Sequence, residues 1–346
     1  MKTIFGLLFL SVFSMAAQTT EKKTIPFADQ WTFVGKAVEE PNYHIWCTSP
    51  IIADDGKVHL FVSRWKKEFK VDPGWRSQSE IAHYVGDTPE GSFRFQEVVL
   101  KGDTTNTWDK YGYHNPLIKK IGEYYALYFI ANDNPNQPPH PSNQRIGLVI
   151  SKNINGPWQK VGDEGMILAP SKNPKNWTFQ AKNGVNNPAV LEHPQGGIFL
   201  YFKSNNALMG LAVADDLTGK YVQMPSPVTK NNTAIEDGYA FMMDSTFCLL
   251  TTDNHGILEK GGGILWQSKD GISFDKTELG FHIIEKYTGK EALKKAKRHY
   301  GGNIIKFERP QLLLKNGKPT YLFITSGYNI YGGESTVSYV LKFKGI

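Results

Sequence analysis

Apolar strand-like runs recur five times along the chain, and each begins at a short turn-like sequence and contains a polar turn. The five starts are Thr48-Ser49-Pro50, His114-Asn115-Pro116, Asn187-Pro188, Glu236-Asp237-Gly238 and Glu308-Arg309-Pro310. Runs of this length, rich in β-branched and aromatic residues and bounded by Gly, Pro, Asn or Asp, predict strands joined by hairpins. Each start therefore leads into a pair of strands, over residues 51–65, 117–133, 189–204, 239–253 and 311–327.

Further strands follow each pair. Residues 79–100, 144–161, 207–224 and 262–279 each contain an alternating apolar segment, a Gly-aromatic turn and another strand. The fifth unit has three evident strands, and the segment 31–38 can supply the fourth. Since repeats at this interval are typical of propeller blades, we expect an all-β, five-bladed β-propeller, closed by pairing of the N-terminal strand with the last blade.

Three segments depart from the repeat. Residues 1–17 carry Lys2, an apolar run too short to span a bilayer, and small residues at 14, 16 and 17, which predicts a cleaved signal peptide. We expect the remainder, 18–346, to form a single propeller domain in an exported protein, periplasmic or secreted. The Pro/Asn-rich segment 132–144 predicts a loop, and residues 289–299 predict one short helix.

The charge and composition of the sequence limit the kinds of molecule that the protein is expected to bind. The formal net charge is +6, which fits an anionic glycan and fits a solvated basic helix surface equally well. Export and the lack of a recognisable motif disfavour nucleic acid, and nothing after residue 20 is apolar enough for a membrane helix. Cys47 and Cys248 lie in apolar strands of different units, so two separate buried thiols are favoured over a disulfide. Oligomeric state is not indicated.

A ring of blades brings the starts of all five units to one central mouth, where polar side chains converge. Two carboxylates from different blades facing one cleft are what glycosidic hydrolysis requires. We therefore take Asp237 and Glu308 as candidate catalytic residues, treated as repeat-equivalent; a structural Glu308–Arg309 ion pair and an ordinary acidic turn at Glu236-Asp237 are the alternatives. His114 is a candidate proton donor.

Other residues are candidates for binding substrate. Trp46 and Trp65, with Trp75, Tyr111 and Tyr113, offer aromatic faces on which sugars stack, although aromatic residues also pack between blades. Arg64 could hold an acidic group, with Glu80 and Lys203 as alternative structural partners. The remaining candidates at the mouth are His44, Asn187, His299 and Arg309. No metal-binding pattern is present, and no cofactor is expected, although a structural cation in the central channel is compatible with the sequence.

The segments HIWCTSPI, SEIAHYV, HNPLI, NNPAVL, EDGYAFM and FERPQLL, within residues 40–328, resemble a group of bacterial five-bladed propeller glycoside hydrolases. That group is akin to the family 117 anhydro-galactosidases and more distantly to the family 43 arabinosidases and xylosidases. The resemblance implies exo-acting cleavage of a terminal sugar from a polysaccharide fragment, commonly algal, with inversion. It implies that Asp237 and Glu308 are the carboxylates and that His114, His44 or His299 is the His donor. The Asp that opens the first inner strand in family 43 is absent, so arabinosidase or xylosidase activity is not supported.

The predicted function is therefore an exported glycoside hydrolase acting on an oligosaccharide. Two alternatives stay open, because a fold does not fix a function: a non-catalytic glycan-binding propeller and a polysaccharide lyase.

Overall fold

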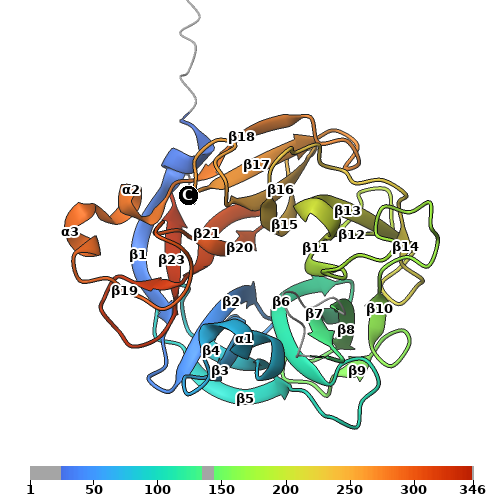
Figure 1. Ribbon diagram of the computed structural model, residues 1–346, viewed down its shortest axis with the longest axis horizontal. Helices are drawn as coiled ribbons and strands as arrows, with labels where there is room; N and C mark the ends of the chain where they lie inside the picture. Colours follow the sequence, from blue (N-terminus) through green and yellow to red (C-terminus); the bar gives the residue numbers. More distant parts are fainter. Residues whose placement is uncertain (1–24, 135–143, 345–346) are drawn as a thin grey trace, which may run out of the picture.

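Five small antiparallel sheets stand around a common axis in the computed structural model, which describes residues 25–134 and 144–344 (Figure 1). The predicted signal peptide and most of the predicted loop at 132–144 lie outside the described residues. The innermost strands of neighbouring sheets contact one another around a complete ring. The predicted five-bladed β-propeller is confirmed.

The strands run outward from the axis in chain order in blades 1, 3 and 4, and over the first three strands of blade 2. Blade 1 contains β2 (Tyr43–Ile52), β3 (Val58–Lys66), β4 (Glu80–Gly86) and β5 (Arg94–Leu100). Blade 2 contains β6 (Tyr111–Ile121), β7 (Tyr124–Asn132), β8 (Arg145–Ser151), β9 (Gln159–Lys160) and β10 (Met166–Leu168). Both β9 and β10 pair with β8. Blade 3 contains β11 (Asn186–Glu192), β12 (Ile198–Lys203), β13 (Met209–Ala214) and β14 (Val222–Gln223). Blade 4 contains β15 (Ile235–Met243), β16 (Thr246–Asp253), β17 (Gly263–Ser268) and β18 (Lys276–Phe281).

Blade 5 closes the ring with strands from both ends of the chain. Its order is β20 (Glu308–Lys315), β21 (Lys318–Ser326), β23 (Val337–Phe343) and β1 (Trp31–Val38). The pairing of the N-terminal strand with the last blade is as the sequence predicted, and its register runs from Trp31 opposite Phe343 to Val38 opposite Ser338. Trp31 also packs its ring 4.8 Å from that of Phe343. Joining the two ends in one sheet leaves the ring without an open gap between its first and last blades.

The helical segments are short and lie before β1 or in the connections between strands. They are η1 (Phe27–Gln30), α1 (Val71–Ser77), η2 (Asn205–Ala207), α2 (Ile284–Thr288) and α3 (Lys290–Leu293). Of these, α1 reaches the axis, where it packs on β6. The prediction of a single helix over 289–299 is wrong. Gly289 adopts φ +77° between α2 and α3, and residues Lys297–Arg298 form the short strand β19, which pairs with β22 (Tyr328–Asn329). None of the helices in the described part of the chain is long and apolar enough to cross a bilayer.

Every innermost strand contains the same irregularity near the axis. One residue in each adopts a positive φ, between 40° and 65°, and the strand register shifts at that point; these residues are Cys47, Asn115, Asn187, Asp237 and Arg309, here named the hub ring. A bulge of this kind breaks the normal alternation of side chains. As a result, the residue before each hub residue also points toward the axis, on the side of the pocket described below. These five residues are Trp46, His114, Asn186, Glu236 and Glu308, here named the pocket ring.

The residue after each bulge is adapted to it. Proline follows three hub residues, at 116, 188 and 310, where it adds rigidity without losing a ladder hydrogen bond. Gly238 follows Asp237, and a Cβ there would come within 2.7 Å of the Met209 side chain. In blades 2 to 5 the turn-like starts recognised in the sequence contain these bulges, whereas in blade 1 the bulge at Cys47 lies just before the predicted start at Thr48.

Both cysteines are buried and free, as predicted. Cys47 belongs to the hub ring, where its Sγ lies 3.3 Å from the Pro116 carbonyl oxygen. Cys248 lies in β16 in the core of blade 4.

Candidate active site

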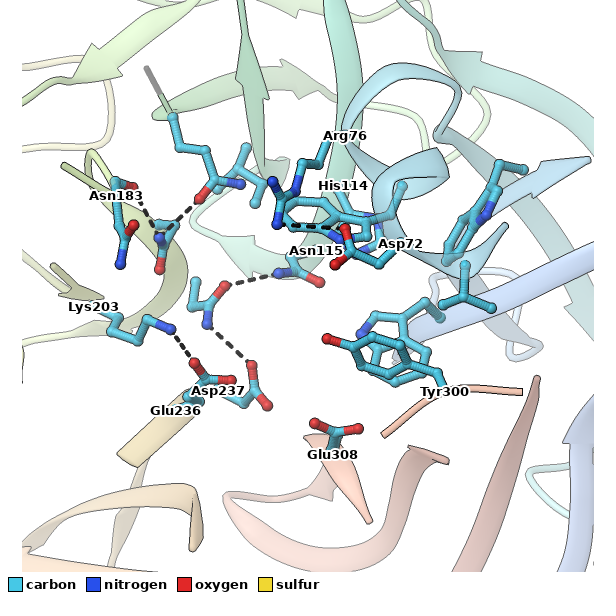
Figure 2. A pocket seen from close by; sticks show the side chains of 18 residues that line it. Asp72, Arg76, His114, Asn115, Asn183, Lys203, Glu236, Asp237, Tyr300 and Glu308 are labelled. Atoms are coloured by element: carbon cyan, nitrogen blue, oxygen red, sulfur yellow. Dashed lines mark hydrogen bonds and ion pairs between the residues drawn. The ribbon is translucent and has the colours of Figure 1, made fainter. Parts of the chain in front are cut away.

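A polar pocket of about 420 Å³ opens at the axis above the bulges (Figure 2). All five pocket-ring residues line it, together with three hub-ring residues and the helix α1. The remaining lining comes from loops and outer strands. The full set is Trp46, Trp65, Val71, Asp72, Trp75, Arg76, His114, Asn115, Ile130, Gln144, Asn183, Asn186, Asn187, Lys203, Glu236, Asp237, Tyr300 and Glu308.

Three carboxylates from blades 4 and 5 gather on one side of this pocket. One oxygen from each of Glu236, Asp237 and Glu308 lies within 4.8 Å of the others. The expectation that Asp237 and Glu308 share a cavity is therefore confirmed. Their assumed equivalence by repeat is wrong, because Glu308 corresponds to Glu236 and Asp237 corresponds to Arg309. The turn-like starts Glu236-Asp237-Gly238 and Glu308-Arg309-Pro310 already align Glu236 with Glu308, but the sequence does not show which of two adjacent residues faces the pocket.

Glu308 is held in a state close to half-protonated at neutral pH. Its side chain is buried, and burial raises its pKa to about 7, aided by the neighbouring Asp237 and opposed by Lys306. Lys306 Nζ lies 2.7 Å from Glu308 Oε1, while Oε2 is buried and has no hydrogen-bond partner among the described residues. A carboxyl group with this pKa can donate a proton near neutrality.

Glu236 has the opposite character. Burial works against its ionisation, but the ammonium groups of Lys203 and Lys306 outweigh burial and lower the pKa of Glu236. Lys203 forms a direct ion pair with it, and 32% of the Glu236 side chain is exposed. Two neighbouring carboxyls whose pKa values are pushed apart in this way divide the roles of acid and of nucleophile or base.

Asp237 is committed to the hub ring. Its Oδ1 accepts hydrogen bonds from Asn187 Nδ2 (3.0 Å) and Arg309 Nη1 (3.5 Å). Its Oδ2 accepts hydrogen bonds from Thr252 Oγ1 (3.0 Å) and the Arg309 backbone N–H (3.2 Å). Both oxygens are thus occupied. The alternative ion pair predicted for Arg309 exists, but with Asp237 in place of Glu308.

The three histidine candidates lie in different settings. His114 lines the pocket between Trp65 and Trp75, and its Nδ1 lies 2.9 Å from Ser79 Oγ. Burial, with a contribution from Arg309, lowers the pKa of His114 well below its ordinary value, so its ring is neutral at physiological pH. His44 and His299 are outside the pocket lining, with ring centroids 6.5 Å apart. His44 precedes the pocket ring by two residues and is not the repeat equivalent of His114, which corresponds to Trp46.

Aromatic side chains form the wall opposite the amide-rich side of the pocket. Trp46, Trp65 and Trp75 line it. Tyr300, from the segment before β20, also lines it (Figure 2). Tyr113 is packed in the blade 2 core with its ring 4.9 Å from that of Phe129, and Tyr111 does not line the pocket.

Arg64 is a structural residue outside the pocket. Its Nε donates to Glu80 Oε1 at 2.9 Å, its Nη1 donates to Glu40 at 3.0 Å, and its guanidinium lies over the rings of Tyr43 and Phe95. The alternative pairing of Arg64 with Glu80 is therefore confirmed. The prediction that Arg64 and Glu80 contribute to the pocket is wrong, because neither side chain lines it. Lys203 lines the pocket and pairs with Glu236 rather than with Arg64.

Helix α1 supplies pocket residues that the sequence did not indicate. Asp72 and Arg76 project from it and form an ion pair at 3.4 Å. The helix sits against Gly112 at the start of β6, where a Cβ would come within 2.3 Å of the Arg76 carbonyl oxygen. Asn132 Nδ2 donates to the same carbonyl at 2.9 Å. The proline and glycine of this segment resemble an ordinary loop, and no apolar period marks the helix.

The three clustered carboxylates are also spaced to hold a metal ion. Each has a cationic partner: Lys203 for Glu236, Arg309 for Asp237 and Lys306 for Glu308. Their charge is therefore compensated by the chain itself, and the residues do not call for a bound cation.

The chain is a five-bladed β-propeller with a polar pocket on its axis, and solved structures share this architecture. Zg3597, a family 117 glycoside hydrolase from Zobellia galactanivorans, superposes with a TM-score of 0.65 at 15% identity over 90% of each chain. CoXyl43, a β-xylosidase/α-arabinofuranosidase from a compost microbial metagenome, gives 0.59 at 13% identity over 92% of this chain and 95% of its own. An exo-1,5-α-L-arabinanase from a bovine ruminal metagenomic library gives 0.55 at 14% identity over 86% and 93%. At these identities the likeness shows the fold. No protein-family profile matches the sequence, and neither does any curated protein.

Proposed function

We propose that this protein is an exported glycoside hydrolase that removes a terminal sugar from an oligosaccharide. The observation that carries the proposal is the pair Glu308 and Glu236, with pKa values displaced in opposite directions in one pocket. The aromatic wall offers faces for a sugar ring, and the amide groups opposite offer hydrogen bonds. The resemblance of the sequence to propeller glycoside hydrolases and the structural likeness to such enzymes support the same conclusion.

The shape of the site supports action at a chain end. The hub ring forms the floor of the pocket through cross-blade hydrogen bonds. Deeper along the axis, Lys119 of blade 2 donates to the Tyr239 hydroxyl of blade 4, which donates to the Leu312 carbonyl of blade 5. A closed floor stops a saccharide chain from passing along the axis, and this favours entry of a chain end from the mouth.

In the reaction, protonated Glu308 gives its proton to the glycosidic oxygen as the bond from that oxygen to the anomeric carbon breaks. Glu236 is the ionised partner. Retaining pairs lie about 5–5.5 Å apart, whereas inverting pairs lie about 6.5–9.5 Å apart because a water must fit between them. The closest oxygens of Glu236 and Glu308 lie within 4.8 Å, so this pair fits attack of Glu236 on the anomeric carbon. Water then releases the sugar from Glu236 and returns a proton to Glu308.

The inversion implied by the sequence resemblance needs a different partner. Asp72 lies on the opposite side of the pocket from Glu308 (Figure 2). Its carboxylate could act as the base that activates the attacking water. Glu236 as nucleophile predicts a first product with retained configuration, and Asp72 as base predicts an inverted one. The anomer that forms first therefore identifies which carboxylate works with Glu308.

The test is incubation with a panel of algal and plant oligosaccharides, with products followed by mass spectrometry and time-resolved ¹H NMR. We expect release of one monosaccharide with retained configuration. An inverted first product would exclude Glu236 as nucleophile and favour Asp72 as base. Binding without any cleavage would indicate a glycan-binding propeller, and an unsaturated product absorbing in the ultraviolet would indicate a lyase. Export stays a prediction from residues 1–17, tested by locating the processed protein after cell fractionation.

A further inference from the structure

Three hub-ring residues form a directional chain of hydrogen bonds beneath the pocket. Asn187 Nδ2 donates to Asp237 Oδ1 at 3.0 Å, and Asn115 Nδ2 donates to Asn187 Oδ1 at 2.7 Å. All three residues are buried and adopt positive φ values of 51°, 54° and 65°. Such backbone conformations hold only where the surroundings fix them, so the three side chains start from rigid positions.

The direction of these hydrogen bonds follows from the carboxylate of Asp237, which is the last acceptor in the series. An ionised carboxylate only accepts hydrogen bonds, so Asn187 must turn its NH₂ group toward Asp237 and its oxygen toward Asn115. Asn115 must then turn its own NH₂ group toward Asn187. The carboxylate of Asp237 therefore determines the orientation of the Asn187 and Asn115 amides. This orientation leaves Asn115 Oδ1 as the free acceptor at the other end of the series.

Asn115 Oδ1 is a buried acceptor with no hydrogen-bond partner among the described residues, and Asn115 lines the pocket. In the neighbouring blade 3, Asn186 is fixed independently, because its Nδ2 donates to Gln144 Oε1 (2.9 Å) and to the Asn183 carbonyl (3.2 Å). Asn186 Oδ1 is likewise buried and unpartnered, as is Glu308 Oε2. Three rigid oxygens thus lack donors in residues that line one pocket, and leaving a buried acceptor without a donor is unfavourable.

We propose that Asn115 Oδ1 and Asn186 Oδ1 each accept a hydrogen bond from a free hydroxyl of the bound sugar, and that Asp237 is a positioning residue that aims Asn115 through Asn187. The inference rests on the proposed function and specifies its substrate class: a sugar with free hydroxyls at those two positions. A carboxylate or sulfate ester offers only acceptors and would face acceptor oxygens there. Charged substituents are thus excluded at the two positions that Asn115 and Asn186 contact.

The experiment compares a hydrolysed glycoside from the panel with its mono-deoxy and mono-O-methyl analogues, using wild type, Asn115→Ala, Asn186→Ala and Asn187→Ala. For wild type, we expect two hydroxyls whose removal lowers kcat/KM roughly 10- to 100-fold. Asn115→Ala should abolish discrimination at one of them and Asn186→Ala at the other. Asn187→Ala leaves Asn115 in place but removes its orientation, so it should reduce discrimination at the Asn115-dependent hydroxyl alone. The control is Asn153→Ala, an exposed asparagine on the outer part of blade 2, which should discriminate as wild type does.

A general structural weakening would lower activity on parent and analogue by the same factor and leave their ratio unchanged. An unchanged ratio in Asn115→Ala and Asn186→Ala, with the parent glycoside still hydrolysed, would overturn this inference and leave the proposed function standing. If glycans bind but are not cleaved, the same ratios are measured as Kd by calorimetry. If the panel yields neither hydrolysis nor binding, both proposals fail together.

Discussion

Two rings of five side chains surround the axis one residue apart in sequence, and they have different duties. The hub ring is buried, and it joins the blades through hydrogen bonds and the Asp237–Arg309 pair. All five residues of the pocket ring line the pocket, and they include both acids with displaced pKa values. One bulge per blade produces both rings, because it turns two consecutive side chains toward the axis. Adjacent residues such as Glu236 and Asp237 are therefore expected to fail in different ways when mutated.

The largest effect should come from the pocket ring. Glu308→Gln removes the transferable proton but keeps the shape of the side chain, so kcat should fall by about 10²- to 10⁴-fold, with no loss of thermal stability. Activity is measured on the best glycoside of the panel and stability by calorimetry. Glu291→Gln in α3, where the glutamate is exposed, is the matched control. Turnover within a few-fold of wild type in Glu308→Gln would remove Glu308 as the acid.

The next prediction compares one substitution in each ring, Glu236→Gln in the pocket ring and Asp237→Asn in the hub ring. Glu236→Gln should lose most turnover while its urea midpoint stays close to that of wild type. Asp237→Asn leaves the buried Arg309 without its counter-charge, and removing one partner of a buried pair costs about 3–5 kcal/mol. Asp237→Asn should therefore lower the free energy of unfolding by an amount of that order. The opposite result, a stable Asp237→Asn without turnover beside an active Glu236→Gln, would make Asp237 the catalytic residue and Glu236 its neighbour.

The sequence was sufficient for the fold because its signals are local and repeated. Five hairpins, their turn residues and the unpaired segment 31–38 predicted the ring and its closure. The sequence also predicted that Asp237 and Glu308 share a cavity. It could not indicate which of two adjacent acids faces the pocket, because the bulge depends on backbone geometry. Nor could it place Asp72 and Arg76, because α1 is held on β6 through contacts at Gly112 and Asn132 that join distant parts of the chain.

A change of pH should affect the pocket ring through Glu308. The folded protein holds this carboxyl at a pKa of about 7, above its ordinary value, so the proton needed for catalysis is present below pH 7 and is lost as pH rises through that value. kcat/KM, which reports the free enzyme, should therefore decline on the alkaline side of about pH 7. Lys306 favours the ionised form of Glu308, so Lys306→Met should raise that pKa and move the decline to higher pH. If the alkaline decline in activity occurs at the same pH in Lys306→Met as in wild type, a group other than Glu308 causes it.

The same shift links Glu308 to stability, with a smaller expected effect. Since the folded pKa exceeds the unfolded one, the folded state binds more protons between the two values, and the free energy of unfolding falls as pH rises through that interval. Glu308→Gln removes this dependence. The difference in unfolding free energy between Glu308→Gln and wild type should grow in favour of the variant from pH 5 to pH 8, by at most about 3 kcal/mol. Urea titrations at the two pH values measure it, and parallel curves would show that Glu308 is not held protonated.

The smallest effect is expected at His114, which belongs to the pocket ring but carries no transferable proton at neutral pH. Burial keeps its ring uncharged, and its Nδ1 is engaged with Ser79, so its contribution should be one hydrogen bond to the substrate. His114→Gln keeps a donor near the position of Nε2 and should lower kcat/KM by about tenfold or less, with the alkaline decline unchanged. A His donor of the type implied by the sequence resemblance would behave differently. Its loss would cost about 10²-fold or more and remove a titration from the pH profile, and that result would transfer the role of acid from Glu308 to His114.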